Sequence, residues 1–138
     1  PPRRATDVNV LVRTDSSTPE TRVDWRVDDL EGALAESQAA GKPVLIDFTG
    51  YTCTNCRQME ATVFVEPEVE RVLSEHFIPL KLYTDGPIDG SRFQTYQLQL
   101  TGTVALPTYA IIMPGETRPM RVRSGMMSTE AFLTFLGF

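Results

Sequence analysis

Residues 44–60 read VLIDFTGYTCTNCRQME: a short apolar run, a turn, and a segment that opens on two cysteines. The run Val44–Phe48 has the length and composition of a buried strand, interrupted only by Asp47. Cys53 and Cys56 are the only cysteines in 138 residues, and C-x-x-C spacing lets two thiols close a disulfide within one helical turn. At a helix N-terminus, free backbone N–H groups and the helix dipole favour the thiolate of the first cysteine. The stretch therefore predicts a dithiol that is opened and closed in use.

The composition is that of one globular domain, with 41% hydrophobic and 22% charged residues. A net charge of −5 argues against a general nucleic-acid binder, which needs a basic face. No apolar run approaches the roughly 18 residues of a membrane span, and no secretory signal is visible. Because the chain begins abruptly on PPRR, we expect a processed or excised piece.

Two cysteines and one histidine, His76, limit what the chain can hold. A structural zinc site is nearly always four-coordinate within one domain, so zinc here would need ligands from a partner. A disulfide-stapled secreted domain usually carries more than one cysteine pair. We therefore expect no metal and no cofactor beyond a redox-active disulfide between Cys53 and Cys56. We expect His76 to be a half-exposed helix residue.

Turn residues and hydrophobic periodicity predict an N-terminal extension or linker at 1–24 and one domain at 25–138. A D-x-x-E start at Asp28 precedes a helix that ends at Gly41, and Ser91 and Ser128 are placed to cap two later helices. Further helices are predicted at 53–63, 66–76 and 91–97, and strands at 8–12, 44–48, 78–83, 109–113 and 120–123. This order predicts an α/β domain with a mixed sheet.

The pattern resembles the thioredoxin fold over residues 25–138. The C-x-x-C pair follows a buried strand, and Leu106-Pro107-Thr108 stands before another strand. Asp47, six residues before Cys53, matches the buried acid of thioredoxins, and residues 81–85 and 124–126 resemble two further family segments. The resemblance implies a central mixed β-sheet flanked by helices. It also implies that Pro107 is cis and lies against the dithiol, where it shapes the groove that receives a partner chain.

Within that superfamily, GKPVLIDFTGY at 41–51 and RQME at 57–60 resemble the C-terminal soluble domain of DsbD-type thiol:disulfide interchange proteins. The resemblance implies a periplasmic or extracytoplasmic domain of a membrane-anchored protein. It would receive electrons from a membrane-embedded donor and pass them to a soluble thioredoxin-like acceptor. Thr52 stands in place of the common tryptophan, and Thr54-Asn55 differs from the dipeptides of thioredoxins, oxidases and isomerases. The redox poise is therefore left open.

Four residues are expected to carry the chemistry: Cys53, Cys56, Asp47 and Glu60. Cys53 is the expected nucleophile, because the first cysteine of the helix is the more exposed sulfur, and Cys56 is the resolving thiol one turn deeper. Asp47 lies in an apolar strand, where burial raises the pKa of a carboxyl, so it would exchange a proton with Cys56. The alternative for Cys53 and Cys56 is a pair of inert core cysteines. The alternative for Asp47 is a carboxylate at a strand edge that is hydrogen-bonded by backbone or water.

Glu60 matches a second acid that lies near the dithiol in the DsbD-type domain, where it would raise the pKa of a nearby thiol; the alternative is a solvated helix charge. Two further residues are expected to support this chemistry. Lys81 would pair with Asp47 or be exposed, and Arg57 would hold the thiolate by its charge or contact only solvent. The expected groove for the partner chain is formed by Pro107, Leu106, Thr52 and Tyr51.

These features predict a thiol:disulfide oxidoreductase, acting as the reductant in an electron relay on disulfides of other proteins. The absence of a histidine between the cysteines favours a reductant over a strong oxidant. A disulfide oxidase or isomerase and a binding module without redox turnover are the alternatives, as is a cytoplasmic location. The expected partners are proteins rather than nucleic acid, and the expected state is a monomer.

Overall fold

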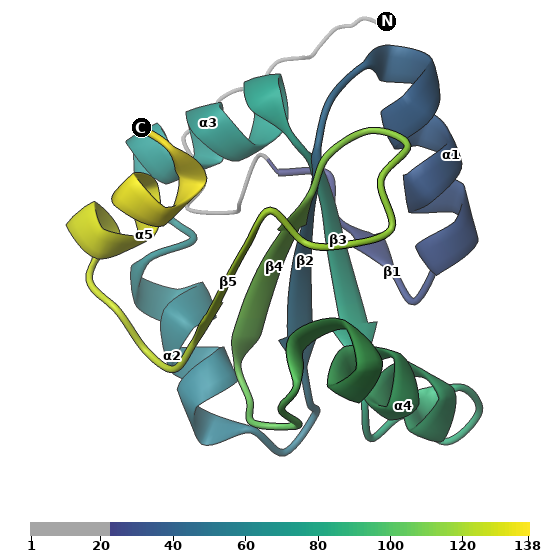
Figure 1. Cartoon of the computed structure of the whole chain (residues 1–138). Coiled ribbons are helices and arrows are strands. Elements are labelled where there is room, and N and C mark those ends of the chain that lie inside the picture. Colours follow the sequence, from purple (N-terminus) through teal and green to yellow (C-terminus); the bar gives the residue numbers. More distant parts are fainter. Residues whose placement is uncertain (1–22) are drawn as a thin grey trace, which may run out of the picture.

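The computed structural model describes residues 23–138, which form a five-stranded sheet with helices on both faces (Figure 1). The strands are β1 (Arg26–Val27), β2 (Val44–Thr49), β3 (Ile78–Tyr83), β4 (Thr108–Ile112) and β5 (Arg121–Ser124). The helices are α1 (Leu30–Ala40), α2 (Thr54–Thr62), α3 (Pro67–His76), α4 (Gly90–Thr101) and α5 (Thr129–Leu136). The strand predicted at 8–12, and all but the end of the predicted extension, lie outside the described residues.

The strand order β1-β3-β2-β4-β5 places β2 at the centre of the sheet, as predicted. β2 pairs in parallel with β3 and antiparallel with β4, and β5 lies antiparallel to β4. The predicted mixed α/β sheet is therefore confirmed, with β1 as a two-residue strand that the sequence did not indicate. β2, β3 and β5 end at the level where β4 begins. The loops at 50–53, 84–89, 105–107 and 125–127 therefore meet at one end of the sheet.

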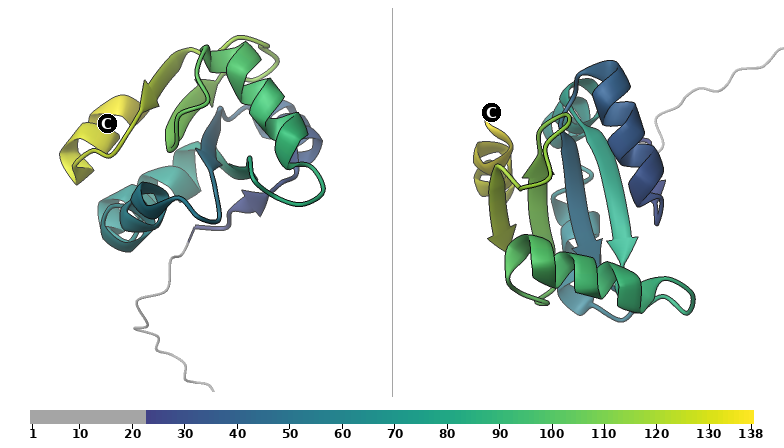
Figure 2. Two further views of the ribbon diagram at one scale, coloured as in Figure 1. Left: turned by 90° about the horizontal axis from the view of Figure 1, so that it is seen from below. Right: turned by 45° about the vertical axis from the view of Figure 1, so that its right-hand side comes forward.

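Each face of the sheet has its own apolar layer. α1 and α4 cover the face that carries Val44, Ile46 and Phe48, whereas α2, α3 and α5 cover the opposite face (Figure 2). Side chains alternate along a strand, so Leu45 and Asp47 project from that opposite face. One strand thus supplies core to both layers and directs a single carboxyl toward α2.

The start of α1 differs from the prediction by one residue. Asp29, not Asp28, is the N-cap, and its side chain accepts a hydrogen bond from the N–H of Gly32. Asp28 instead adopts a left-handed conformation, with φ of 57°, and its carboxylate accepts from the N–H of Tyr83 at 2.9 Å. The D-x-x-E pattern missed this because Asp28 is used to bond the neighbouring strand β3.

The helix predicted from Ser91 begins at Gly90 and runs to Thr101, a turn beyond the predicted end. Leucine and glutamine at 98–100 favour helix, and Gly102, with φ of 80°, ends it. Asp89 occupies the N-cap position without a side-chain hydrogen bond, so Ser91 does not cap this helix. β4 and β5 are each displaced by about one residue from their predicted bounds.

Ser128→Ala is expected to lower the free energy of unfolding by about 1 kcal/mol, because the Ser128 hydroxyl caps α5 by accepting from the N–H of Ala131. Chemical denaturation of the purified protein measures this loss. Ser91→Ala is the matched control: this exposed serine caps nothing, so its substitution should leave the unfolding free energy unchanged. Equal losses in the two variants would contradict the assignment of the cap.

Candidate active site

Cys53 and Cys56 lie at the start of α2 and are joined by a disulfide. Cys53 is the N-cap residue, and its sulfur accepts a hydrogen bond from the backbone N–H of Cys56 at 3.1 Å. Cys53 is partly exposed, whereas only 2% of Cys56 is accessible to solvent. This is the predicted asymmetry between the sulfurs. A helix N-terminus also stabilises negative charge on the outer sulfur when the bond is open.

The loop before β4 faces the loop that leads to Cys53. The Leu106–Pro107 peptide bond is cis, as the resemblance implied, and Pro107 is buried. A Cβ at Gly50 would lie 3.1 Å from Cδ1 of Leu106, so the two loops are in close contact. The Pro107 carbonyl accepts from the N–H of Gly125, while the backbone of Leu106 makes no hydrogen bond within residues 23–138. Leu106 therefore offers backbone groups for pairing with an extended chain.

Asp47 is buried in β2, with Lys81 of β3 and Tyr109 of β4 directly beside it in the sheet. Burial raises the pKa of its carboxyl to about 7; Lys81 and Arg57 oppose that shift, and Glu60 adds to it. The predicted rise in pKa is confirmed. Within the described residues, the Oδ1 atom of Asp47 has no hydrogen-bond partner. The site thus holds one buried carboxyl whose pKa lies near neutral pH.

Glu60 is the acceptor of two cations and not a solvated charge. Its Oε2 atom lies 2.9 Å from Nη2 of Arg57 and 3.4 Å from Nζ of Lys81. Lys81 forms its ion pair with Glu60 and not with Asp47, although its charge lowers the Asp47 pKa. Arg57 bonds Glu60 and the Thr49 hydroxyl, so it does not contact only solvent, and its expected action on a thiolate stays a prediction. Two positive charges compensate Glu60, so its expected effect on a thiolate is reduced by its own partners.

Tyr51 and Thr52 precede Cys53 at the surface. Tyr51 is 54% exposed and its ring stacks on that of Tyr83, with centroids 4.0 Å apart. Arg57 lies over the other aromatic ring of this pair, 5.9 Å from the Tyr83 centroid. The predicted groove residues and the predicted chemical residues therefore converge on one end of the sheet, around the loop at 50–53.

Asp85 belongs to the same loop cluster, and sequence reasoning did not single it out. Its carboxylate accepts from the backbone N–H groups of Tyr51, at 2.9 Å, and Thr52, at 3.4 Å. The Tyr51 N–H is the main cause of the lowered pKa of the Asp85 carboxyl. The only signal in the sequence was an aspartate directly after a strand and before Gly86, which a turn explains equally well.

Asp85→Ala is expected to slow disulfide exchange several-fold and to lower the free energy of unfolding by about 1–2 kcal/mol, because two N–H groups next to Cys53 lose a charged acceptor. Turnover with a protein disulfide and chemical denaturation measure the two effects. Asp85→Asn retains an oxygen acceptor and should fall between the wild type and Asp85→Ala. Wild-type behaviour of Asp85→Ala in both measurements would remove Asp85 from the site.

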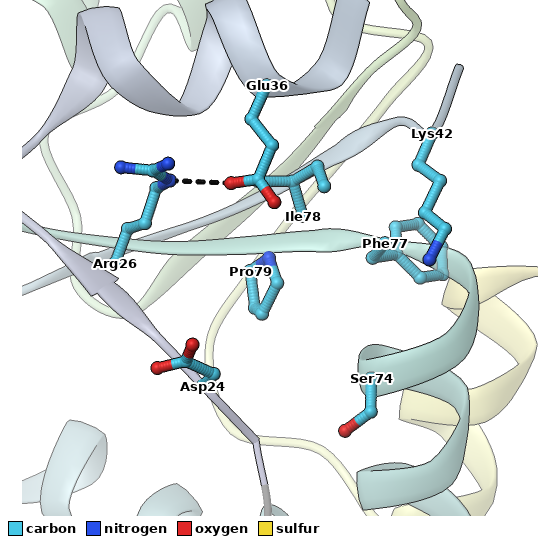
Figure 3. A pocket seen from close by; sticks show the side chains of 8 residues that line it. All are labelled: Asp24, Arg26, Glu36, Lys42, Ser74, Phe77, Ile78 and Pro79. Atoms are coloured by element: carbon cyan, nitrogen blue, oxygen red, sulfur yellow. Dashed lines mark hydrogen bonds and ion pairs between the residues drawn. The ribbon is translucent and has the colours of Figure 1, made fainter. Parts of the chain in front are cut away.

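A hollow of about 520 Å³ lies at the other end of the sheet, where β2 and β3 begin (Figure 3). Arg26 and Glu36 form an ion pair on one wall, and Ser74 of α3 and Phe77, the residue after that helix, line another. Its four charged side chains, two acids and two bases, balance one another.

His76 is exposed on α3, as predicted. Residues 23–138 contain no group of three or more His, Cys, Asp or Glu residues that is placed to hold a metal ion.

The fold and the disulfide at the start of α2 define a thioredoxin-fold domain equipped for thiol:disulfide exchange. The chain belongs to the thioredoxin-like family, whose sequence profile matches residues 24–114. It is 34% identical over 111 residues to the thiol:disulfide interchange protein DsbD of Cronobacter sakazakii, and 31% identical over 114 residues to that of Vibrio cholerae. Each alignment covers 80% of this chain but 18% of the relative, so the chain spans under a fifth of these relatives.

Solved structures show the same fold. A thioredoxin from Thermus thermophilus superposes with a TM-score of 0.68 at 26% identity, over 83% of this chain and 85% of that chain. The reduced C-terminal domain of Neisseria meningitidis DsbD gives a TM-score of 0.63 at 19% identity, over 80% and 96%. The resemblance to thioredoxin-like and DsbD-type proteins is therefore confirmed. No helix in the part of the chain that the structure describes has the length and apolar character needed to cross a membrane.

Proposed function

We propose that this domain is a protein-disulfide reductase that passes electrons to disulfides in other proteins. The observation that carries the proposal is the Cys53–Cys56 disulfide at the N-terminus of α2, with Cys53 accessible and Cys56 buried beneath it. One sulfur is thus placed to meet a partner, and the other to complete the reaction out of solvent.

In the reduced form, the Cys53 thiolate attacks one sulfur of the partner's disulfide. The partner's bond breaks, a mixed disulfide forms on Cys53, and the released partner thiolate takes a proton. Asp47 then accepts the proton of the Cys56 thiol, and the Cys56 thiolate attacks the Cys53 sulfur. The Cys53–Cys56 disulfide forms as the second partner sulfur leaves. Two electrons have moved to the partner, and Asp47 returns its proton to solvent or to the leaving thiolate.

The supporting residues contribute to these reaction steps in two ways. The Glu60 carboxylate binds both Arg57 and Lys81 and so holds these two positive charges near Asp47. Their combined electrostatic effect keeps the pKa of Asp47 near the working pH. Tyr51, Thr52, Leu106 and Pro107 form the surface that receives the partner's extended chain. Support for this comes from the exposure of Tyr51 and from the backbone groups of Leu106, which make no other hydrogen bond within residues 23–138.

The names of the relatives support a place for this domain in an electron relay. By that analogy the donor is a membrane-embedded protein domain and the acceptor is a soluble thioredoxin-like domain. The domain itself, residues 25–138, would face the periplasm or another extracytoplasmic compartment as part of a membrane-anchored protein. We expect it to act as a monomer, without a metal or other cofactor.

The test is reduction of insulin by the pre-reduced protein in stoichiometric amounts. We expect insulin to precipitate while one disulfide forms per protein molecule, detected as the loss of both cysteine thiols. Protein that stays reduced in the presence of insulin and of a panel of peptide disulfides would overturn the proposed function. Heat-unfolded, pre-reduced protein is the control for exchange by unstructured thiols.

A further inference from the structure

Tyr109 places a hydroxyl in the same buried layer as Asp47. The two residues are direct partners across β2 and β4, so their side chains leave the sheet on the same face. Both are buried, Tyr109 completely and Asp47 to all but 2%. The ring of Tyr109 makes edge-to-face contacts with the rings of Phe64 and Phe132, with centroids 6.0 Å and 5.2 Å apart, respectively. The Tyr109 hydroxyl is thus a polar group on a ring that packs among aromatic side chains.

Neither polar group is satisfied within residues 23–138. The Tyr109 hydroxyl and Oδ1 of Asp47 are both buried side-chain atoms without a hydrogen-bond partner. Buried polar groups in folded proteins are nearly always bonded, and leaving a buried donor unpaired destabilises the fold. A donor and an acceptor thus lie on adjacent strands and on one face of the sheet, and in this structure they are not bonded to each other.

The charged form of Asp47 is the state that needs a donor. The groups that face Asp47 come from every neighbouring element: Lys81 and Tyr83 of β3, Tyr109 of β4, and Arg57 and Glu60 of α2. Glu60 engages Nη2 of Arg57 and Nζ of Lys81, whereas Nε of Arg57 is a further buried side-chain atom without a partner within residues 23–138. Burial and the two carboxylates raise the pKa of Tyr109, so its hydroxyl keeps its proton and remains a donor throughout the working range.

We propose that Tyr109 is a positioning residue whose hydroxyl donates a hydrogen bond to the Asp47 carboxylate when Asp47 loses its proton. The bond forms as Asp47 ionises and loosens as it is protonated, so Tyr109 stabilises one of the two states between which Asp47 must cycle. This inference rests on the proposed role of Asp47 in taking the Cys56 proton. It adds a residue of β4 to a site otherwise built from β2, β3 and α2.

The test measures the pKa of Asp47 in the oxidised Tyr109→Phe protein. The NMR chemical shift of the Asp47 carboxyl carbon, recorded as the pH is varied, reports the titration. We expect the Asp47 pKa to rise by about one unit, because a hydrogen bond to a charged group is lost. The pH profile of insulin reduction should move upward by the same amount. Tyr96→Phe is the matched control: Tyr96 packs against Phe48 on the opposite face, and its hydroxyl should not affect Asp47.

A double-mutant cycle separates this role from simple packing. At pH 8, Tyr109→Phe should lower the unfolding free energy more in the wild type than in an Asp47→Asn background, where no charge needs the hydroxyl. An Asp47 pKa that moves no further in Tyr109→Phe than in Tyr96→Phe would overturn the inference. The titration needs no turnover, so this failure is distinct from failure of the insulin test, which would overturn the proposed function instead.

Discussion

Cys56→Ser is expected to trap a partner protein on Cys53 as a stable mixed disulfide, and Cys53→Ser is expected to abolish exchange. Without Cys56 no buried thiol can attack the Cys53 sulfur, so the reaction stops after its first step. Without Cys53 the remaining sulfur is only 2% exposed and cannot meet a partner. The rate of insulin reduction by Cys53→Ser should fall by more than about 1,000-fold, the scale seen when a nucleophile is removed.

Mass spectrometry under non-reducing conditions measures both outcomes. The Cys56→Ser protein should carry the mass of one partner peptide, released by dithiothreitol, and Cys53→Ser should carry none. The double variant controls for non-specific adducts. If Cys53→Ser formed the adduct and Cys56→Ser did not, the assignment of attacking and resolving sulfur would be reversed.

Asp47→Asn is expected to stabilise the oxidised protein strongly at pH 8 and hardly at all at pH 4. The folded protein raises the pKa of Asp47 to about 7, against an ordinary value near 4 in the unfolded chain. The folded state therefore binds the proton more tightly, and stability falls as pH rises through this window. Above the window the ionised carboxyl costs the wild type up to about 4 kcal/mol, which the neutral amide avoids.

Guanidinium denaturation at the two pH values measures this difference, with unchanged m-values showing that the unfolding transition is the same. Glu116→Gln, which removes an exposed carboxylate in the turn between β4 and β5, is the control and should show no such dependence. The same Asp47→Asn protein should resolve mixed disulfides more slowly, because Cys56 loses its proton acceptor. A stability gain that is equal at pH 4 and pH 8 would mean that burial does not raise the Asp47 pKa.

Residues whose role follows from local chemistry were predictable from the sequence. The apolar run at 44–48 indicated a central strand, and C-x-x-C directly after it indicated an exposed and a buried sulfur. The pKa of Asp47 followed from one carboxyl among apolar neighbours. The cis state of Pro107 was implied by the resemblance to thioredoxins and not by the residues themselves, since most X–Pro bonds are trans.

Partners joined across the fold were not predictable in the same way. Lys81 sits beside Asp47 in the strand register, yet its ammonium group reaches Glu60, 21 residues earlier in the chain. Asp85 bonds a loop 33–34 residues away, and Tyr109 reads as ordinary strand core until its register with Asp47 is known. Such pairings depend on which strands become neighbours, and neither periodicity nor capping signals carry that information.

The reduction potential of the Cys53–Cys56 pair tests the central claim most directly, by equilibration against glutathione or dithiothreitol buffers and counting of free thiols. A protein that passes electrons to partner disulfides should have a potential near that of thioredoxin, about −270 mV. A potential near that of DsbA, about −120 mV, would make the domain an oxidant and reverse the proposed direction of electron flow.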